Sequence, residues 1–534
     1  MALLAKKCLV TGALLFSASV LGAQATPAKP TCDVDETAKG NAARATLLVK
    51  LAKDAASPPV AASNLKGAVK LLEHLDKGDD PVTNAYVLGS ALSLWGNQPN
   101  IGLSPKRGAL GFTDKPEATI ELPATLDSLF KVVETAKPNC SDYTAYWRAG
   151  QKFYLDVVNS AINSLNGEKL DSAEYFATQA NKLYSASPYG DMVLGSVASK
   201  KGNTARAIEY WTKSAEVAAK DSSYRDVRRQ MLASLGSAYM ETANSATGAD
   251  KAAAARKAAD VYAQLIAVPG SKGSYLNVGR QQLQTAYLLA GDTAAAVKTW
   301  EPLIANPSAY DYQDLLNSAV TAARANRTAD AGKLFEATLS QNPNSRDALY
   351  NVAVTYLTLE QNEKVGPIVK RLVEVDPGNP ENYNLAARAY LSLAKASTTA
   401  KKAAAAAAYN DTTVTWYNSG NKLPIEVTFN EFSPGDKQVV IGGSVLDRRD
   451  KVEANGAPAA VAKPVKGKPA PKAAPTKTYP PKPATLTFVA LDKAGAVVGT
   501  ETVTTEPLSP GQRGKFKVTI AAPNVVAYRY TIVD

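Results

Sequence analysis

The sequence has few of the side chains that most catalytic and metal sites require. Its 534 residues include a single histidine, His74, and three cysteines. One histidine excludes a His-rich metal site and argues against a Ser-His-Asp or Cys-His catalytic arrangement. The chain also has no Cys-x2-Cys pair, no P-loop and no Gly-x-Gly-x2-Gly fingerprint. We therefore expect a protein that is not an enzyme, that holds neither a metal ion nor a cofactor, and that has His74 on its surface.

Paired carboxylates are the one catalytic arrangement that the composition leaves open. A glycosidase-type site would need two Asp or Glu side chains facing each other across a pocket, ~5–10 Å apart. Pairs such as Asp79-Asp80 lie in stretches expected to be loops, where acidic residues are common and need no catalytic role. The sequence therefore favours a binding protein over such an enzyme.

Long hydrophobic runs are absent except near the N-terminus. Lys6 and Lys7 precede an apolar stretch, Cys8–Gly22, which ends at the small-residue site Ala23-Gln24-Ala25. This order is typical of a secretory signal peptide, here residues 1–25. The alternative, an uncleaved anchor, is disfavoured because about 15 apolar residues are fewer than the roughly 20 that span a bilayer. We expect an exported protein, periplasmic or associated with the cell envelope, that does not span the membrane after cleavage.

Only two cysteines remain after this cleavage, Cys32 and Cys140. An even number of cysteines in an oxidising compartment favours a disulfide. The sequence therefore predicts a Cys32–Cys140 bond, and two separate buried thiols are the alternative.

Basic charge is concentrated in one segment. The formal net charge is +11, and residues 451–482 contain seven lysines and one glutamate. The helical part of the chain is close to neutral, whereas a nucleic-acid-binding surface would be generally basic. Residues 451–484 are dominated by Ala, Pro and Lys, so we expect a disordered, polyproline-II-like excursion. Its charge could hold an anionic polymer, and the alternative is a solvated loop.

The strongest pattern is a pair of amphipathic helices that recurs along the chain. In one unit, which Pro377 closes, the first helix has apolar residues at the i, i+3, i+4 and i+7 positions of one face: Leu349, Val352, Ala353 and Tyr356. Thirty-four residues later the same phase returns at Tyr383, Ala386, Ala387 and Tyr390. Small residues recur in the second helices, each followed four residues later by an aromatic side chain: Ala207 and Trp211, Ala258 and Tyr262, Ala296 and Trp300, Ala331 and Phe335.

This period and these positions resemble the tetratricopeptide repeat, in which a small residue lets two helices approach and an aromatic one fills the groove to the next pair. One such repeat cannot bury its apolar face alone, so neighbours must stack. The resemblance implies a mainly α fold, an α-solenoid of about seven or eight helix pairs. It also implies a concave surface, lined by the first helix of each pair, that binds a peptide or partner protein.

Polar and aromatic residues on these first helices are the candidate binding residues. Asparagine and arginine repeated along a groove can hydrogen-bond an extended peptide or capture a carboxylate. The alternative is that these side chains are only the solvated faces of helices. The candidates are Gln313, Asn317, Arg324, Tyr350, Asn351, Asn384 and Arg388.

The remaining segments complete the expected organisation. Residues 26–139 predict irregular helix pairs with a Gly- and Pro-rich insertion at 97–122, and residues 140–409 the regular array. From residue 410 apolar and polar residues alternate, which predicts a small all-β sandwich over 410–534. The stretch from Leu508 to Val518 resembles the late strands of FxLYD-type, immunoglobulin-like domains. The expected strands lie at 414–417, 425–429, 439–445, 485–491, 496–504, 514–520 and 527–533.

The sequence therefore predicts a non-catalytic scaffold or adaptor of the bacterial envelope that binds a peptide or partner protein. The alternative is an envelope surface protein that holds an anionic polymer (cell wall, lipid or nucleic acid) through the basic excursion and the β-domain. Neither hypothesis requires a specific nucleic-acid site.

Overall fold

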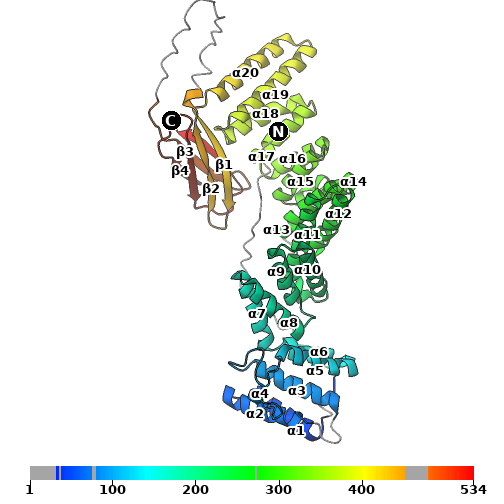
Figure 1. Cartoon of the computed structure of the whole chain (residues 1–534). Coiled ribbons are helices and arrows are strands. Elements are labelled where there is room, and N and C mark those ends of the chain that lie inside the picture. The colour runs from blue at the N-terminus through cyan, green and yellow to red at the C-terminus, as the bar shows by residue number, and fades with distance from the viewer. Residues whose placement is uncertain (1–31, 35–37, 75–79, 271–273, 452–478, 534) are drawn as a thin grey trace, which may run out of the picture. The chain divides into compact units, whose positions relative to one another are not determined.

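The computed structural model describes residues 32–34, 38–74, 80–270, 274–451 and 479–533 (Figure 1). The signal peptide expected at 1–25 lies outside these residues, as does most of the basic excursion expected at 451–484. Contacts divide the chain into two compact units, Met1–Gly279 and Arg280–Asp534, which are described in turn.

The first unit consists of helices. Two irregular pairs come first, and regular antiparallel pairs follow from α7 onward. The helices are α1 (Gly40–Lys53), α2 (Pro58–Leu72), α3 (Pro81–Gly96), α4 (Arg107–Leu110), α5 (Leu122–Ala136), α6 (Ser141–Ala149), α7 (Lys152–Asn166), α8 (Leu170–Leu183), α9 (Tyr189–Lys200), α10 (Thr204–Ala218), α11 (Arg225–Ser245) and α12 (Gly248–Ala267), with the start of α13 (Ser274–Leu289).

The insertion between α3 and α5 is folded and packs on α2. The Glu73 carboxylate, just after α2, accepts hydrogen bonds from the backbone N–H of Thr113 at 2.7 Å and of Asp114 at 2.6 Å. Gly111 has a φ of 106° and lies so close to the Lys66 backbone that a Cβ would stand 2.7 Å from it. These contacts are structural, and they fix the insertion to the helix before it.

Small and aromatic residues pack in the regular pairs as the repeat pattern predicts. A Cβ added to Gly195 of α9 would lie 2.4 Å from the Trp211 ring of α10, and one added to Gly236 of α11 would lie 2.5 Å from the Tyr262 ring of α12. Ala207 and Ala258 are completely buried. The helices of these pairs therefore approach closely because a glycine of the first helix faces an aromatic ring of the second.

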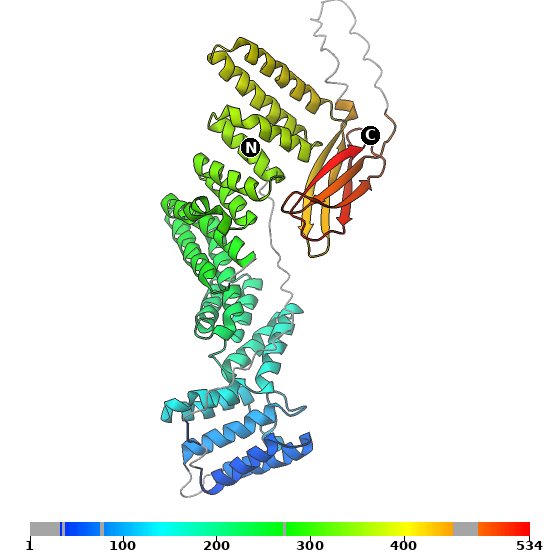
Figure 2. The same cartoon turned by 180° about the vertical axis from the view of Figure 1, so that it is seen from behind.

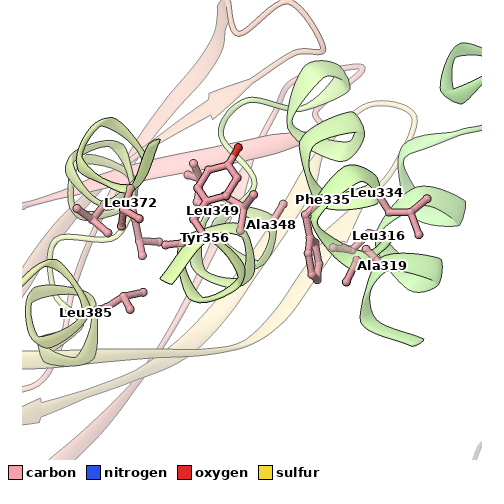
Figure 3. Close-up of a cluster of buried hydrophobic side chains, with 14 of the residues drawn as sticks. Leu316, Ala319, Leu334, Phe335, Ala348, Leu349, Tyr356, Leu372 and Leu385 are labelled. Atoms are coloured by element: carbon pink, nitrogen blue, oxygen red, sulfur yellow. The ribbon is translucent and has the colours of Figure 1, made fainter. Parts of the chain in front are cut away.

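The second unit continues the helix pairs and adds a β-domain. Its helices after α13 are α14 (Thr293–Ala305), α15 (Tyr312–Arg324), α16 (Thr328–Gln341), α17 (Arg346–Thr358), α18 (Asn362–Val375), α19 (Pro380–Thr399) and α20 (Ala403–Asn421). One continuous apolar core joins neighbouring pairs, with Phe335, Leu349 and Leu372 contributed by successive helices (Figure 3). Side chains at equivalent positions of neighbouring repeats also form hydrogen bonds. Gln284 Nε2 donates to Ser318 Oγ, 34 residues later in the chain, at 2.8 Å.

The prediction of a strand at 414–417 is wrong, because these residues lie inside α20. Two facts explain the difference. The alanine-rich start of α20 favours helix, and the Trp416 ring packs edge-on against Tyr383 of α19 with centroids 5.9 Å apart. Alternation over only four residues is a weak signal that this packing overrides. The helical array therefore extends to Asn421, and the β-domain begins at 425 instead of 410.

The other expected strands are present, within a few residues of their predicted ends. They are β1 (Ile425–Pro434), β2 (Val439–Asp447), β3 (Thr485–Leu491), β4 (Val497–Thr504), β5 (Arg513–Ile520) and β6 (Ala527–Val533). Two antiparallel three-stranded sheets form, in the orders β1-β2-β5 and β4-β3-β6. Val427 faces Val445 across the first sheet, and Phe488 faces Tyr530 across the second.

The two sheets share one aromatic core, which makes the domain a small β-sandwich. The ring of Phe429 in the first sheet contacts Phe488, Tyr528 and Tyr530 of the second, with centroids 5.3–6.1 Å apart. Aromatic pairs at such separations stabilise a core beyond the area they bury. The alternation of buried and exposed residues along β5 follows the period-2 rule.

Candidate functional site

The predicted binding residues lie on three first helices: α15 carries Gln313, Asn317 and Arg324, α17 carries Tyr350 and Asn351, and α19 carries Asn384 and Arg388. Gln313 Nε2 donates to Asn317 Oδ1 at 2.9 Å, and Asn351 Nδ2 donates to the Asp347 carbonyl at 2.7 Å. These amides are thus partly used within their own helices. Arg324 and Arg388 are exposed. The structure joins Gln313 to Asn317 and places Tyr350 at a cavity, and it does not gather the seven residues into one pocket.

A groove that the sequence did not single out lies in the first unit. A cavity of about 440 Å³ opens between α9 and α11, the first helices of neighbouring pairs. Its walls carry small polar residues, among them Ser199 and Ser234, while Trp211 of α10 forms part of its lining. Tyr275 of α13 borders it and is 40% exposed. Serines spaced along a helix did not predict this groove, because they line a cavity only once the neighbouring helix packs beside them.

In the second unit the β-domain is attached to the loops between helix pairs. Tyr530 Oη of β6 donates to Asp376 Oδ1 at 2.6 Å and accepts from the Gly378 N–H at 2.9 Å. The Val427 N–H of β1 donates to the Gly378 carbonyl at 2.8 Å. In both views the β-domain lies beside α17 and α18 (Figures 1 and 2).

The electrostatics of this attachment follow from burial. Burial raises the pKa of Tyr530, and the neighbouring Asp376 carboxylate, which would repel a phenolate, raises it further. Burial also raises the pKa of Tyr528, although the positive charge of Arg346 lowers that pKa in part. Both phenols therefore stay protonated and neutral at physiological pH.

A second cavity, of about 300 Å³, lies where α17, α19 and β1 meet. Arg346, Asp347 and Tyr350 of α17 line one side, and Val427, Thr428 and Phe429 of β1 line another. The Arg346 guanidinium carbon lies 4.2 Å from the centre of the Phe429 ring and 4.7 Å from that of Tyr528. Sequence reasoning missed Arg346, because its aromatic neighbours are more than eighty positions away along the chain.

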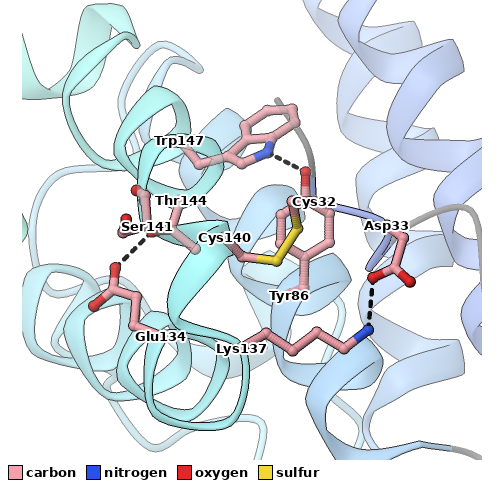
Figure 4. Close-up of a disulfide and its surroundings, with 9 residues drawn as sticks. All are labelled: Cys32, Asp33, Tyr86, Glu134, Lys137, Cys140, Ser141, Thr144 and Trp147. Carbon is pink, nitrogen blue, oxygen red and sulfur yellow. Dashed lines mark hydrogen bonds and ion pairs between the residues drawn. A yellow bond between two sulfur atoms is a disulfide. The ribbon is translucent and has the colours of Figure 1, made fainter. Parts of the chain in front are cut away.

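The predicted pairing of Cys32 and Cys140 is present in the structure (Figure 4). The bond ties the first described residues to the turn before α6. Nearby, Trp147 Nε1 donates to Tyr86 Oη at 2.8 Å and Lys137 Nζ pairs with Asp33 Oδ1 at 2.9 Å. His74 is exposed, as expected.

Over the residues that the structure describes, no three His, Cys, Asp or Glu side chains group as metal ligands would. The helices in this part of the chain are all too short or too polar to cross a membrane.

Comparisons with known proteins add to this description. A search of curated proteins finds no match. Among solved structures, a tetratricopeptide repeat protein of Parabacteroides merdae is 14% identical over 49% of this chain and 98% of that one, with a TM-score of 0.27. YrrB, described as a TPR protein with an unusual peptide-binding site, is 17% identical over 40% of this chain and 96% of that one, with a TM-score of 0.28. Both TM-scores are too low to establish a common overall fold.

The family comparison is specific to one part of the array. Residues 322–389, from the end of α15 into α19, match the model of the tetratricopeptide repeat family. This segment is the one whose helices share the continuous core and the period described above. Residues 322–389 are therefore similar to tetratricopeptide repeats, and the family match covers this segment alone.

Proposed function

We propose that this protein is a non-catalytic scaffold of the bacterial envelope, which binds a peptide or a partner protein on the first helices of its repeats. The observation that carries the proposal is the groove between α9 and α11, with its volume of about 440 Å³. The fold itself supports protein–protein interaction, and the groove supplies a place for it.

The lining of this groove suits a polypeptide. Its serines offer hydroxyl groups that both donate and accept hydrogen bonds, as an extended main chain requires. Exposed Tyr275 and partly buried Gln230 add an apolar surface and an amide at its border. Small side chains on both walls keep the groove open, because a larger residue at these positions would fill it.

Export is the second part of the proposal. The N-terminal residues have the order of a signal peptide, and the bond between Cys32 and Cys140 is of the kind that persists in oxidising compartments. The periplasm or the cell envelope is therefore the proposed location.

A groove-filling substitution tests the binding role. Ser199 of α9 is exposed and lines the groove, whereas Ala205 of α10 is exposed and does not line it. Partners captured from an envelope extract would be identified, purified, and titrated against the Ser199→Trp and Ala205→Trp variants. We expect Ser199→Trp to weaken binding about tenfold or more, since a large side chain displaces the ligand, and Ala205→Trp to bind like the wild type.

Equal affinity of the wild type and Ser199→Trp would refute the groove as the binding surface. Loss of envelope association on deletion of residues 451–484, with Ser199→Trp unaffected, would instead support the holding of an anionic polymer.

A further inference from the structure

The outer face of α1 carries two exposed leucines. Leu47 is 59% exposed and Leu51 is 50% exposed, whereas Ala45 and Val49 on the opposite side of the helix are buried. Residues four apart lie on the same side of a helix, so the two leucines form one apolar strip. A single exposed leucine is ordinary, but neighbouring ones on one face mark a candidate contact surface.

Basic side chains flank this apolar strip. In a helix with about 3.6 residues per turn, Arg44 lies about 60° to one side of Leu47 and Lys50 about 60° to the other. Both basic side chains are exposed. The outer face of α1 therefore presents apolar groups in its middle and positive charges at its edges.

The second helix, α2, extends this surface. A Cβ added to Gly67 of α2 would lie 3.1 Å from the end of the Leu48 side chain of α1, so the two helices are in direct contact. Both views show them side by side at one end of the first unit (Figures 1 and 2). Val60, at the start of α2, is 52% exposed, and Lys66 and Lys70 are exposed as well.

The charge on the surface of this helix pair is almost entirely positive. Residues 38–74 contain two acidic side chains, Asp54 and Glu73, and six basic ones: Lys39, Arg44, Lys50, Lys53, Lys66 and Lys70. All six basic side chains are exposed, and none of them forms an ion pair with a residue that the structure describes. The Glu73 side chain is only 3% exposed and binds the insertion, which leaves Asp54 as the exposed acidic side chain within 38–74.

We propose that the outer surface of α1 and α2 binds an anionic lipid surface. Leu47 and Leu51 enter the boundary between headgroups and acyl chains, and the flanking Arg44 and Lys50 stay at the lipid phosphates, as in amphipathic helices that lie in a membrane interface. The inference goes beyond the proposed scaffold role, because it assigns a surface that holds the protein at a membrane without a spanning helix.

An acidic protein is the competing occupant of this surface. The six cations are spread over two helices and have no bonded partners that fix their positions. Such side chains suit a fluid layer of phosphates, in which headgroups move to meet each charge, and every Lys or Arg near that layer strengthens binding about fivefold. A protein would need acidic groups at fixed, matching positions.

Co-sedimentation with vesicles tests the proposal. The chain used is residues 26–534, which retains every residue that the structure describes and lacks the apolar N-terminal stretch, since that stretch would insert into lipid by itself. One set of vesicles contains equal parts of phosphatidylcholine and phosphatidylglycerol, and the other contains phosphatidylcholine alone. We expect binding to the anionic vesicles to be about tenfold tighter or more and to weaken as salt is added, because salt screens exposed charges.

Two variants locate the binding surface. Leu47→Ser/Leu51→Ser should weaken binding to the anionic vesicles about tenfold or more, because two apolar side chains no longer leave water. Arg44→Gln/Lys50→Gln should weaken it by about the same factor, because two cations near the phosphates are removed. All four side chains are exposed, so neither variant disturbs the core.

Val132→Ser/Leu155→Ser is the matched control. It removes two exposed apolar side chains from α5 and α7 of the same unit, and it should bind like the wild type. The proposal would be overturned by absence of binding, by equal binding to both kinds of vesicle, by wild-type binding of the leucine variant, or by an equal loss in the control. Wild-type binding of the leucine variant would assign the attraction to basic residues elsewhere in the chain. The groove variant Ser199→Trp is titrated with a protein partner, so its result is independent of these.

Discussion

The effect of individual residues is clearest where a glycine meets a side chain of another element. Gly195 and Gly236 face aromatic rings within their own helix pairs, and both positions follow from the repeat pattern. Gly378 is different. It lies in the loop between α18 and α19, and a Cβ there would lie 2.6 Å from Val427 Cγ2 and 2.7 Å from Tyr530 Oη. Glycine at this position is what allows the β-domain to approach the repeats.

Substitution of Gly378 by alanine should therefore destabilise the second unit. Val427 and Tyr530 are buried and cannot move away freely, so we expect a loss of about 1–3 kcal/mol in the free energy of unfolding, typical of overpacking. Gly67→Ala provides the control, because its Cβ would meet only the end of the Leu48 side chain, at 3.1 Å. Gly67 lies inside α2, where alanine favours helix over glycine by about 1 kcal/mol, so this variant should not be destabilised. Urea denaturation followed by circular dichroism measures both, and equal effects would contradict this explanation.

At the scale of elements, the insertion between α3 and α5 shows how one carboxylate fixes a loop. Burial by itself would raise the pKa of Glu73, but hydrogen bonds from the Thr113 hydroxyl and from the Thr113 and Asp114 backbone outweigh it and lower the pKa to about 2. The Glu73 side chain is only 3% exposed. The hydrogen bonds between Glu73 and the insertion explain the order of the insertion without a ligand.

This lowered pKa predicts a dependence of stability on pH. A carboxyl whose pKa is lower in the folded state stabilises the protein above its unfolded value, 4.5, and loses that contribution as the pH falls toward 2. The Glu73→Gln variant should lose about 1–3 kcal/mol at pH 7 and should show a smaller decline than the wild type between pH 4.5 and 2. Urea midpoints at several pH values measure this.

Glu117→Gln is the matched control for this prediction. Glu117 lies in the same insertion and pairs with Lys106 at 2.7 Å, but its side chain is 83% exposed. No measurable loss of stability is expected, because exposed ion pairs are screened by water and salt. A loss as large as that of Glu73→Gln would show that charge, not the buried hydrogen bonds, holds the insertion.

At the scale of the whole molecule, a disulfide links the first residues that the structure describes to the turn before α6. The disulfide closes a loop with a sequence separation of 108 residues. A bond that closes a loop of this length restricts the unfolded chain and so stabilises the folded state.

Removal of this link should lower the stability of the first unit. In the Cys32→Ser/Cys140→Ser variant we expect a loss of about 2–5 kcal/mol, as is usual when a native disulfide that closes a long loop is removed. Thermal unfolding with and without a reductant measures the effect. The reductant should lower the melting temperature of the wild type and leave that of the variant unchanged. If the reductant left the melting temperature of the wild type unchanged, the disulfide would contribute nothing to its stability.

The sequence by itself determined the features that arise from near neighbours in the chain. Helix pairs were predictable because residues such as Ala331 and Phe335 lie four apart on one helix face, and the strands β3 and β6 because their side chains alternate. The pairing of Cys32 with Cys140 was predictable because the third cysteine, Cys8, lies in the expected signal peptide.

Tertiary structure decided the rest. Residues 414–417 became helix because Trp416 packs on α19, and Arg346 came to line a cavity because β1 returns to the start of α17. Tyr530 and Asp376 bond across 154 positions of sequence. A local pattern records only which face of an element is apolar, and it contains no information on which distant element will cover that face.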